Sequence, residues 1–121
     1  MTEEMQQQIF ERLEELGWRG NLKGTEYMSY IIGILLLDES WPLPSNQDIM
    51  REVEEAHGLR HNSATRQIIL ACEEWQSECF RNVFYRDEFQ AIMHREPGTI
   101  RSGCREYIVN LYIYFHKALG C

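Results

Sequence analysis

The sequence predicts an all-α domain of about six helices, and two observations lead to this prediction. Apolar residues recur at helical spacing along almost the whole chain, whereas no segment alternates between apolar and polar residues as a half-buried strand does. The chain has 121 residues, of which 44% are hydrophobic, so it is long enough to form a core without metals or disulfides. We therefore expect residues 1–121 to form a single domain with a central helix-turn-helix.

Capping residues and apolar stripes predict the first two helices. Thr2 can cap a first helix that ends at Gly17. Its inner face consists of Ile9, Leu13 and Leu16. A second helix opens at Gly24 and runs to about Asp38. Because this second helix is apolar nearly all round, we expect it to occupy the middle of the core.

A proline-rich connector follows the second helix. Residues 41–44 (Trp-Pro-Leu-Pro) cannot continue a helix, since each proline lacks an amide donor and constrains the residue before it. Ser45, with Asp48 three residues later, forms a capping pattern that predicts a third helix ending at Gly58. The apolar face expected for this helix consists of Ile49, Met50, Val53 and Ala56.

Three further helices complete the predicted fold. Asn62 or Ser63 can cap a fourth helix, and a fifth covers residues 83–93. After the break at residues 97–98, a last helix runs from about Ser102 and is followed by Gly120. The buried face of the fourth helix should consist of Ala64, Ile68, Ala71, Cys72 and Trp75. That of the last helix should consist of Tyr107, Ile108, Leu111, Tyr112 and Phe115.

Residues 53–68 have the pattern of a helix-turn-helix. The motif needs an apolar residue on the first helix, a glycine in the turn and an apolar residue after it. It also needs a small residue at the helix crossing and a core residue one turn later. The sequence supplies these as Val53, Gly58, Leu59, Ala64 and Ile68. Glu54 stands where the motif usually has alanine, and an ordinary helical hairpin is the alternative interpretation.

A DNA-binding hairpin would place the N-terminal end of its second helix in the major groove. Arg66 is suited to pair with guanine, and Asn62 or Gln67 with adenine. Arg60 and His61 are suited to hold phosphates. The candidate DNA-binding residues are Arg60, His61, Asn62, Ser63, Thr65, Arg66 and Gln67. A solvated polar helix face is the alternative.

Charge is distributed unevenly along the chain. Twelve basic and 19 acidic residues give a net charge of -7, which disfavours DNA binding by bulk charge. Residues 1–57 contain four basic and twelve acidic residues, a net -8, whereas residues 58–121 contain eight basic and seven acidic residues, a net +1. Five arginines of the second half are either phosphate contacts flanking the reading helix or scattered surface residues: Arg81, Arg86, Arg95, Arg101 and Arg105.

Several motifs occur in a recognisable order. Residues 22–28 (Leu-Lys-Gly-Thr-Glu-Tyr-Met) precede the apolar helix and the hairpin, and residues 96–98 (Glu-Pro-Gly) precede the last helix. From about residue 9 to 115 the chain resembles the C-terminal effector domain of the stage-zero sporulation protein A family of response regulators. The resemblance implies a six-helix transcription factor, with double-stranded DNA and RNA polymerase as partners, in which Arg66 matches a DNA-contacting arginine. Ser63 and Ile69 stand where the family has basic residues. We expect a domain of this type without a receiver domain.

The sequence gives little sign of metal binding, redox chemistry or catalysis. His57 and His61 are four residues apart, but Gly58 interrupts the helix between them, so they need not share a metal site. Cys72 and Cys79 lie on one helical stripe, which is typical of packing, and the spacing of the four cysteines favours reduced thiols. No phosphate-binding loop, nucleophile elbow or zinc-protease motif occurs. We therefore expect no enzymatic activity, no cofactor and no metal.

Partners and location follow from the remaining features. The longest apolar run, residues 31–37, is far shorter than the ~20 residues of a membrane span, and no signal peptide opens the chain. We expect a cytoplasmic protein without a membrane partner. The aromatic residues of the last helix are numerous enough to contribute both to the core and to a homodimer interface. Self-association is favoured where a protein binds paired DNA half-sites. The alternative function is a protein-interaction module of the same fold that has lost DNA binding and modulates a related regulator.

Overall fold

The computed structural model describes residues 3–38, 42–98 and 103–119. These residues form six α-helices and no strand, which confirms the predicted fold class. The helices are α1 (Glu3–Glu15), α2 (Lys23–Leu37), α3 (Asn46–His57), α4 (Ser63–Arg81), α5 (Val83–Met93) and α6 (Cys104–Ala118). Several expectations lie outside the described residues: the Thr2 cap, Trp41 of the connector, Arg101, the start of the last helix at Ser102, and Gly120 after that helix.

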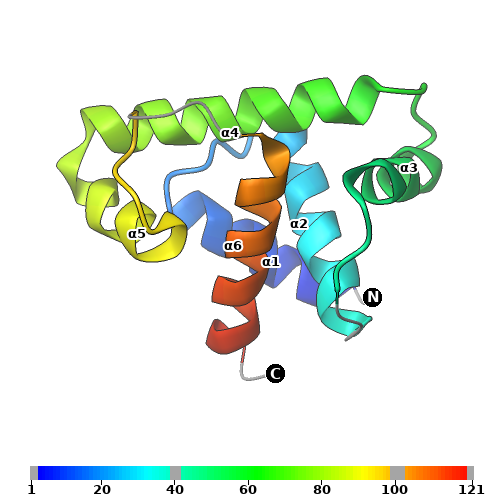
Figure 1. The fold of residues 1–121 in the computed structure, drawn as a ribbon, viewed down its shortest axis with the longest axis horizontal. Coiled ribbons are helices and arrows are strands. Elements are labelled where there is room, and N and C mark those ends of the chain that lie inside the picture. Colours follow the sequence, from blue (N-terminus) through cyan, green and yellow to red (C-terminus); the bar gives the residue numbers. More distant parts are fainter. Residues whose placement is uncertain (1–2, 39–41, 99–102, 120–121) are drawn as a thin grey trace.

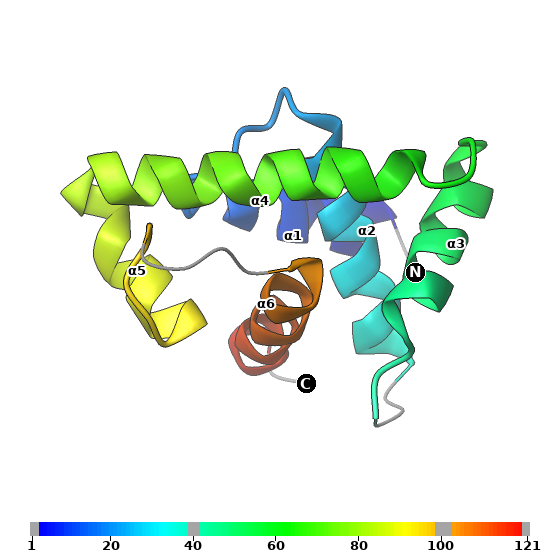
Figure 2. The same ribbon diagram turned by 45° about the horizontal axis from the view of Figure 1, so that its top comes forward.

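The longest helix, α4, extends along one side of the molecule (Figure 1). The shorter helices α3 and α5 lie at its two ends, and α1, α2 and α6 lie beneath its middle. A view turned about the horizontal axis keeps α3 and α5 at opposite ends of α4 (Figure 2). One face of α4 is therefore packed on the body of the domain, while its opposite face has no described helix across it.

The contact between α2 and α4 is close because a glycine stands at the crossing. A Cβ atom on Gly24 would collide with the main-chain oxygen of Gln67 and would lie 2.7 Å from the Cβ of Ala71. Ten residues of α2 are buried, so the helix is central to the core as its composition predicts. Glycine at this position lets two main chains approach more closely than any other residue allows.

The side chain of Trp75 connects four segments of the domain. Its indole N–H donates a hydrogen bond of 2.9 Å to the main-chain oxygen of Leu16. Its ring stacks on Trp18 at a centroid distance of 5.1 Å and contacts Phe89 and Tyr107 at 4.8 and 6.0 Å. The segment directly after α1, helix α5 and helix α6 thus meet at one buried side chain of α4. Leu16 and Trp18 are the residues of that segment in contact with it. Its indole donor has a partner, as buried tryptophans usually do.

The start of α3 is fixed by two sets of hydrogen bonds. The hydroxyl of Ser45 accepts the amide of Asp48 at 3.2 Å, so the predicted capping residue is confirmed. From α6, the guanidinium of Arg105 donates to the main-chain oxygens of Pro44 and Leu43 and to the side-chain oxygen of Asn46. The connector before α3 is therefore anchored to α6.

We expect Gly24→Ala to lower the free energy of unfolding by about 2–3 kcal/mol, because the added methyl group has no space between α2 and α4. Urea denaturation measures the change. The matched control is Gly103→Ala, where an added Cβ meets nothing within 4 Å. Because Gly103 is the N-cap residue of α6 and glycine is preferred to alanine there, the control should cost up to about 1 kcal/mol, less than the loss at Gly24. Equal losses for the two variants would contradict the close approach.

Candidate nucleic-acid interface

Helices α3 and α4 are joined by a short turn at one end of the molecule. Figure 1 views α3 nearly along its axis while α4 runs lengthwise, so the two helices cross each other steeply. Gly58 ends α3 in the left-handed region, with φ of 64°, as the sequence predicts for the turn. The amides of Gly58 and Leu59 both donate to the main-chain oxygen of Glu54, which tightens the chain at this point.

Glu54, which departs from the usual motif, lies at the crossing of the two helices. Its side chain is only 8% exposed, and a carboxylate oxygen accepts the amide of Ala64 at 3.4 Å. This amide belongs to the first turn of α4, where the helix itself provides no acceptor. Ala56, expected on the buried face, is exposed instead, because the buried stripe of α3 consists of Ile49, Met50, Val53 and Glu54.

The first turn of α4 differs from the expected capping. Asn62 is the N-cap residue with φ of 68°, but its side chain makes no capping hydrogen bond. The hydroxyl of Ser63 donates to the main-chain oxygen of Arg60 at 2.7 Å. This bond stabilises the turn and does not cap an amide of α4. Glu54 of α3 thus accepts the amide that the sequence assigned to a local cap.

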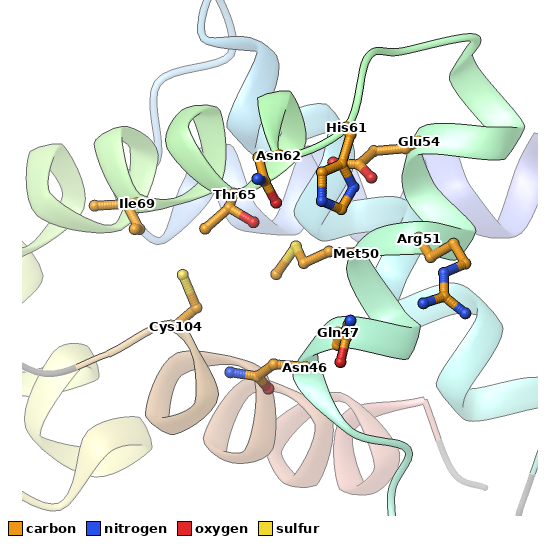
Figure 3. A pocket seen from close by; sticks show the side chains of 10 residues that line it. All are labelled: Asn46, Gln47, Met50, Arg51, Glu54, His61, Asn62, Thr65, Ile69 and Cys104. Atoms are coloured by element: carbon orange, nitrogen blue, oxygen red, sulfur yellow. The ribbon is translucent and has the colours of Figure 1, made fainter.

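Three of the candidate residues line a hollow of about 420 Å³ between α3, the start of α4 and the start of α6 (Figure 3). They are His61, Asn62 and Thr65. Figure 3 shows Asn62 and Thr65 pointing from α4 towards Met50 of α3. The hollow is further lined by Asn46, Gln47, Arg51, Glu54, Ile69 and Cys104.

The structure does not place all seven candidates on one face. Arg60, His61, Asn62 and Arg66 are exposed, whereas Ser63, Thr65 and Gln67 are half-buried. The main chain of Gln67 packs against Gly24 of α2, away from the hollow that Thr65 lines. Arg51, an exposed cation of α3 beside the hollow, is a further candidate that sequence reasoning missed. Its position depends on how α3 crosses α4, which no local pattern reveals.

Most arginines proposed as flanking phosphate contacts bond within the chain. Arg81 pairs with Glu78 at 3.0 Å, and Arg95 pairs with Glu106 at 2.7 Å. Arg86 and Arg105 donate to main-chain oxygens, and Arg101 lies outside the described residues. In contrast, the guanidinium groups of Arg60 and Arg66, both exposed, form no hydrogen bond or ion pair with any described residue. These two are therefore the free arginines nearest the start of α4.

Two of the three acidic residues on the second half of α4 have a cationic neighbour. Glu74 lies 3.7 Å from Arg19, and Glu78 pairs with Arg81. Glu73 is exposed and forms no hydrogen bond or ion pair with a described residue. The repulsion that this half of the helix would exert on phosphate is thus concentrated at Glu73.

The two histidines of the hairpin have separate environments. His57 lies between Tyr27 and Tyr30, at centroid distances of 5.0 and 5.1 Å, and its Nδ1 is 2.8 Å from the main-chain oxygen of Val53. His61 instead lines the hollow. Within the part of the chain that the structure describes, no three His, Cys, Asp or Glu side chains are grouped to hold a metal.

Three cysteines are buried as free thiols. Burial raises the pKa of Cys72 well above its usual value, raises that of Cys79 to about 12, and raises that of Cys104. A protonated, buried thiol is a poor nucleophile and a poor metal ligand. The packing role predicted for the stripe of Cys72 and Cys79 agrees with this environment.

No family model, curated protein or solved structure matches the chain. Among the helices of the described residues, none is both long and apolar enough to cross a membrane. Function is therefore inferred from the geometry of the α3–α4 hairpin and from the surface of α4.

We expect Glu54→Ala to destabilise the protein by about 1 kcal/mol, because the amide of Ala64 loses its acceptor at a buried position. Thermal or urea unfolding measures this loss. Glu54→Gln keeps an acceptor oxygen and should lose less, and Glu55→Ala, an exposed neighbour on α3, should change little. A gain in stability from alanine, the usual residue of the motif, would contradict the capping role.

We expect Cys72 and Cys79 to resist alkylation by iodoacetamide at pH 8 in the folded protein, since both thiols are buried and their pKa values lie above that pH. Mass spectrometry of the digested protein identifies each site. The same reagent should modify both residues in urea. Rapid modification of Cys72 in the native protein would show that the packing of α4 is wrong.

Proposed function

We propose that the chain is a transcriptional regulator that reads duplex DNA with the N-terminal end of α4. The observation that supports this most is the state of Arg66. It lies one turn into α4, is exposed and has no described partner, so it is free to form a bidentate contact with a base edge. Most other arginines of this half of the chain are held by internal hydrogen bonds.

The surroundings of Arg66 agree with this role. The hairpin has a short turn with a left-handed glycine, and the first turn of α4 stands at one end of the molecule (Figure 1). Arg60 on the turn and Arg51 on α3 provide cations on the same part of the hairpin for phosphates. Six helices are also the number implied by the resemblance to the sporulation effector domains, and RNA polymerase is the further partner proposed for such a regulator.

Affinity in this proposal comes from few phosphate contacts. The chain carries a net charge of -7, and a carboxylate of Glu54 already accepts an amide of the first turn of α4. The positive end of the helix is thereby partly compensated and attracts phosphate less than a free helix terminus does. Base contacts must therefore supply most of the discrimination between sequences.

A second candidate function is favoured by the surface at the other end of α4. Three large apolar residues are exposed there: Phe80 by 59%, Val83 by 71% and Phe84 by 80%. Large apolar side chains exposed close together in the sequence are typical of a protein-interaction site. In this second proposal the domain keeps its fold, does not bind DNA, and modulates a related regulator.

We expect Arg66→Ala to weaken specific binding by about 1–3 kcal/mol and to relax base preference at one position. The site is first selected from random duplexes with the unaltered protein, and affinities are then measured by fluorescence anisotropy. Affinity should fall with salt by about one unit of logarithmic slope per phosphate contact.

Arg81→Ala is the matched control for this experiment, because Arg81 pairs with Glu78 at the far end of α4. It should leave binding unchanged. Unchanged binding in the Arg66 variant would refute the role assigned to that residue. If the unaltered protein is not retained on DNA at low salt, the second candidate function replaces the first.

A further inference from the structure

The outer face of α4 carries a stripe of four exposed residues, which we name the outer stripe: Arg66, Ile69, Leu70 and Glu73. Its apolar centre is substantially accessible, with Ile69 39% and Leu70 44% exposed. The buried residues of α4 all lie on its other side. In both ribbon views no described helix lies across the side of α4 that faces away from α1, α2 and α6 (Figures 1 and 2). Ile69 also borders the hollow between α3, α4 and α6.

The two charges of the outer stripe cannot neutralise each other within one molecule. Arg66 and Glu73 are seven residues apart, which corresponds to about 10.5 Å along the helix axis. Ion pairs on one helix form between residues three or four apart. Neither side chain forms a hydrogen bond or ion pair with any described residue, so each presents an unpaired charge beside the apolar centre.

We propose that two copies of the chain associate in antiparallel orientation through their outer stripes. A two-fold axis between Ile69 and Leu70 places Arg66 of one copy opposite Glu73 of the other, and the same pair forms again on the other side of the axis. The apolar residues of both copies meet between the two ion pairs. All four residues of the stripe are used, and both unpaired charges gain a partner.

The order of charges along the outer stripe favours a second copy of the chain as the binding partner. A helix face with a cation at one end, an anion two turns later and apolar residues between them is complementary to itself when reversed. Helix α6, which the sequence predicted as the dimer surface, is a poorer candidate for this contact. Its Tyr107, Tyr112 and Phe115 are buried, and the hydroxyl of Tyr114 accepts a hydrogen bond from Arg12 at 2.8 Å.

The expected dimer is weak and reversible. Four residues from each copy are far fewer than the roughly 20–30 a side of a stable interface, which is why the association is transient. The association does not depend on DNA and is therefore a separate proposal from the function above. The two are connected in one respect, because Arg66 in the dimer is covered and cannot contact a base.

Charge exchange tests the proposal. Sedimentation over a concentration series, without DNA, should show that the unaltered protein dimerises. Arg66→Glu and Glu73→Arg should each weaken the dimer about tenfold or more, because both ion pairs become repulsive. An equimolar mixture of the two variants should associate again, since each copy then meets opposite charges. The double variant should also recover, because its pairs are only reversed.

Two matched controls carry the same charge changes outside the outer stripe. Arg60→Glu and Glu55→Arg alter exposed residues of the turn and of α3 and should leave association unchanged. Far-UV circular dichroism verifies that every variant remains helical. A strictly monomeric unaltered protein, or a mixture that associates no better than its two components, would overturn the proposal. Leu70→Ser should weaken the dimer without any change of charge, and an unaffected dimer would likewise refute it.

Discussion

The close packing of α4 on α2 is the constraint on which the rest of the structure depends. Gly24 permits the approach to Gln67 and Ala71 of α4. One turn beyond Ala71, Trp75 contacts the segment after α1, helix α5 and helix α6. Because one face of α4 is packed in the core, its exposed charged residues and the apolar Ile69 and Leu70 lie on the opposite face. Both proposals concern that opposite face, so the core and the functional surface are two sides of one helix.

Glu54 shows how a local feature of the core affects the surface. A buried carboxylate at the helix crossing stabilises the first turn of α4, but it also compensates the positive end of the helix dipole. The hairpin is thus held together by a charge of the same sign as the phosphate it is proposed to approach. Stability of the hairpin and general affinity for nucleic acid are therefore opposed here, and side chains such as Arg66 must supply the attraction.

Helix positions could be predicted from the sequence because their signals are local. Ser45 before α3, Gly58 after it and the apolar stripes of α4 and α6 each act within a few residues, and all of them are found in the structure. The orientation of the site could not be predicted in the same way. The direction of Thr65 towards the hollow and the burial of Glu54 depend on the crossing of two helices, which is set by contacts distant in the sequence. The hydrogen bonds of Arg105 have the same origin, since this residue meets a connector about sixty residues earlier.

Sharing of Arg66 between the two proposed contacts has a thermodynamic consequence. If self-association and DNA binding both need the same exposed guanidinium, each must weaken the other by the same factor, because coupling between two binding equilibria is reciprocal. DNA would then favour the monomer, and a high concentration of protein would oppose binding to DNA. This is the reverse of the usual arrangement, in which dimerisation places two reading helices on neighbouring half-sites. Glu73, which the DNA interpretation treats as a repulsive residue, is in this scheme the partner that covers Arg66 when DNA is absent.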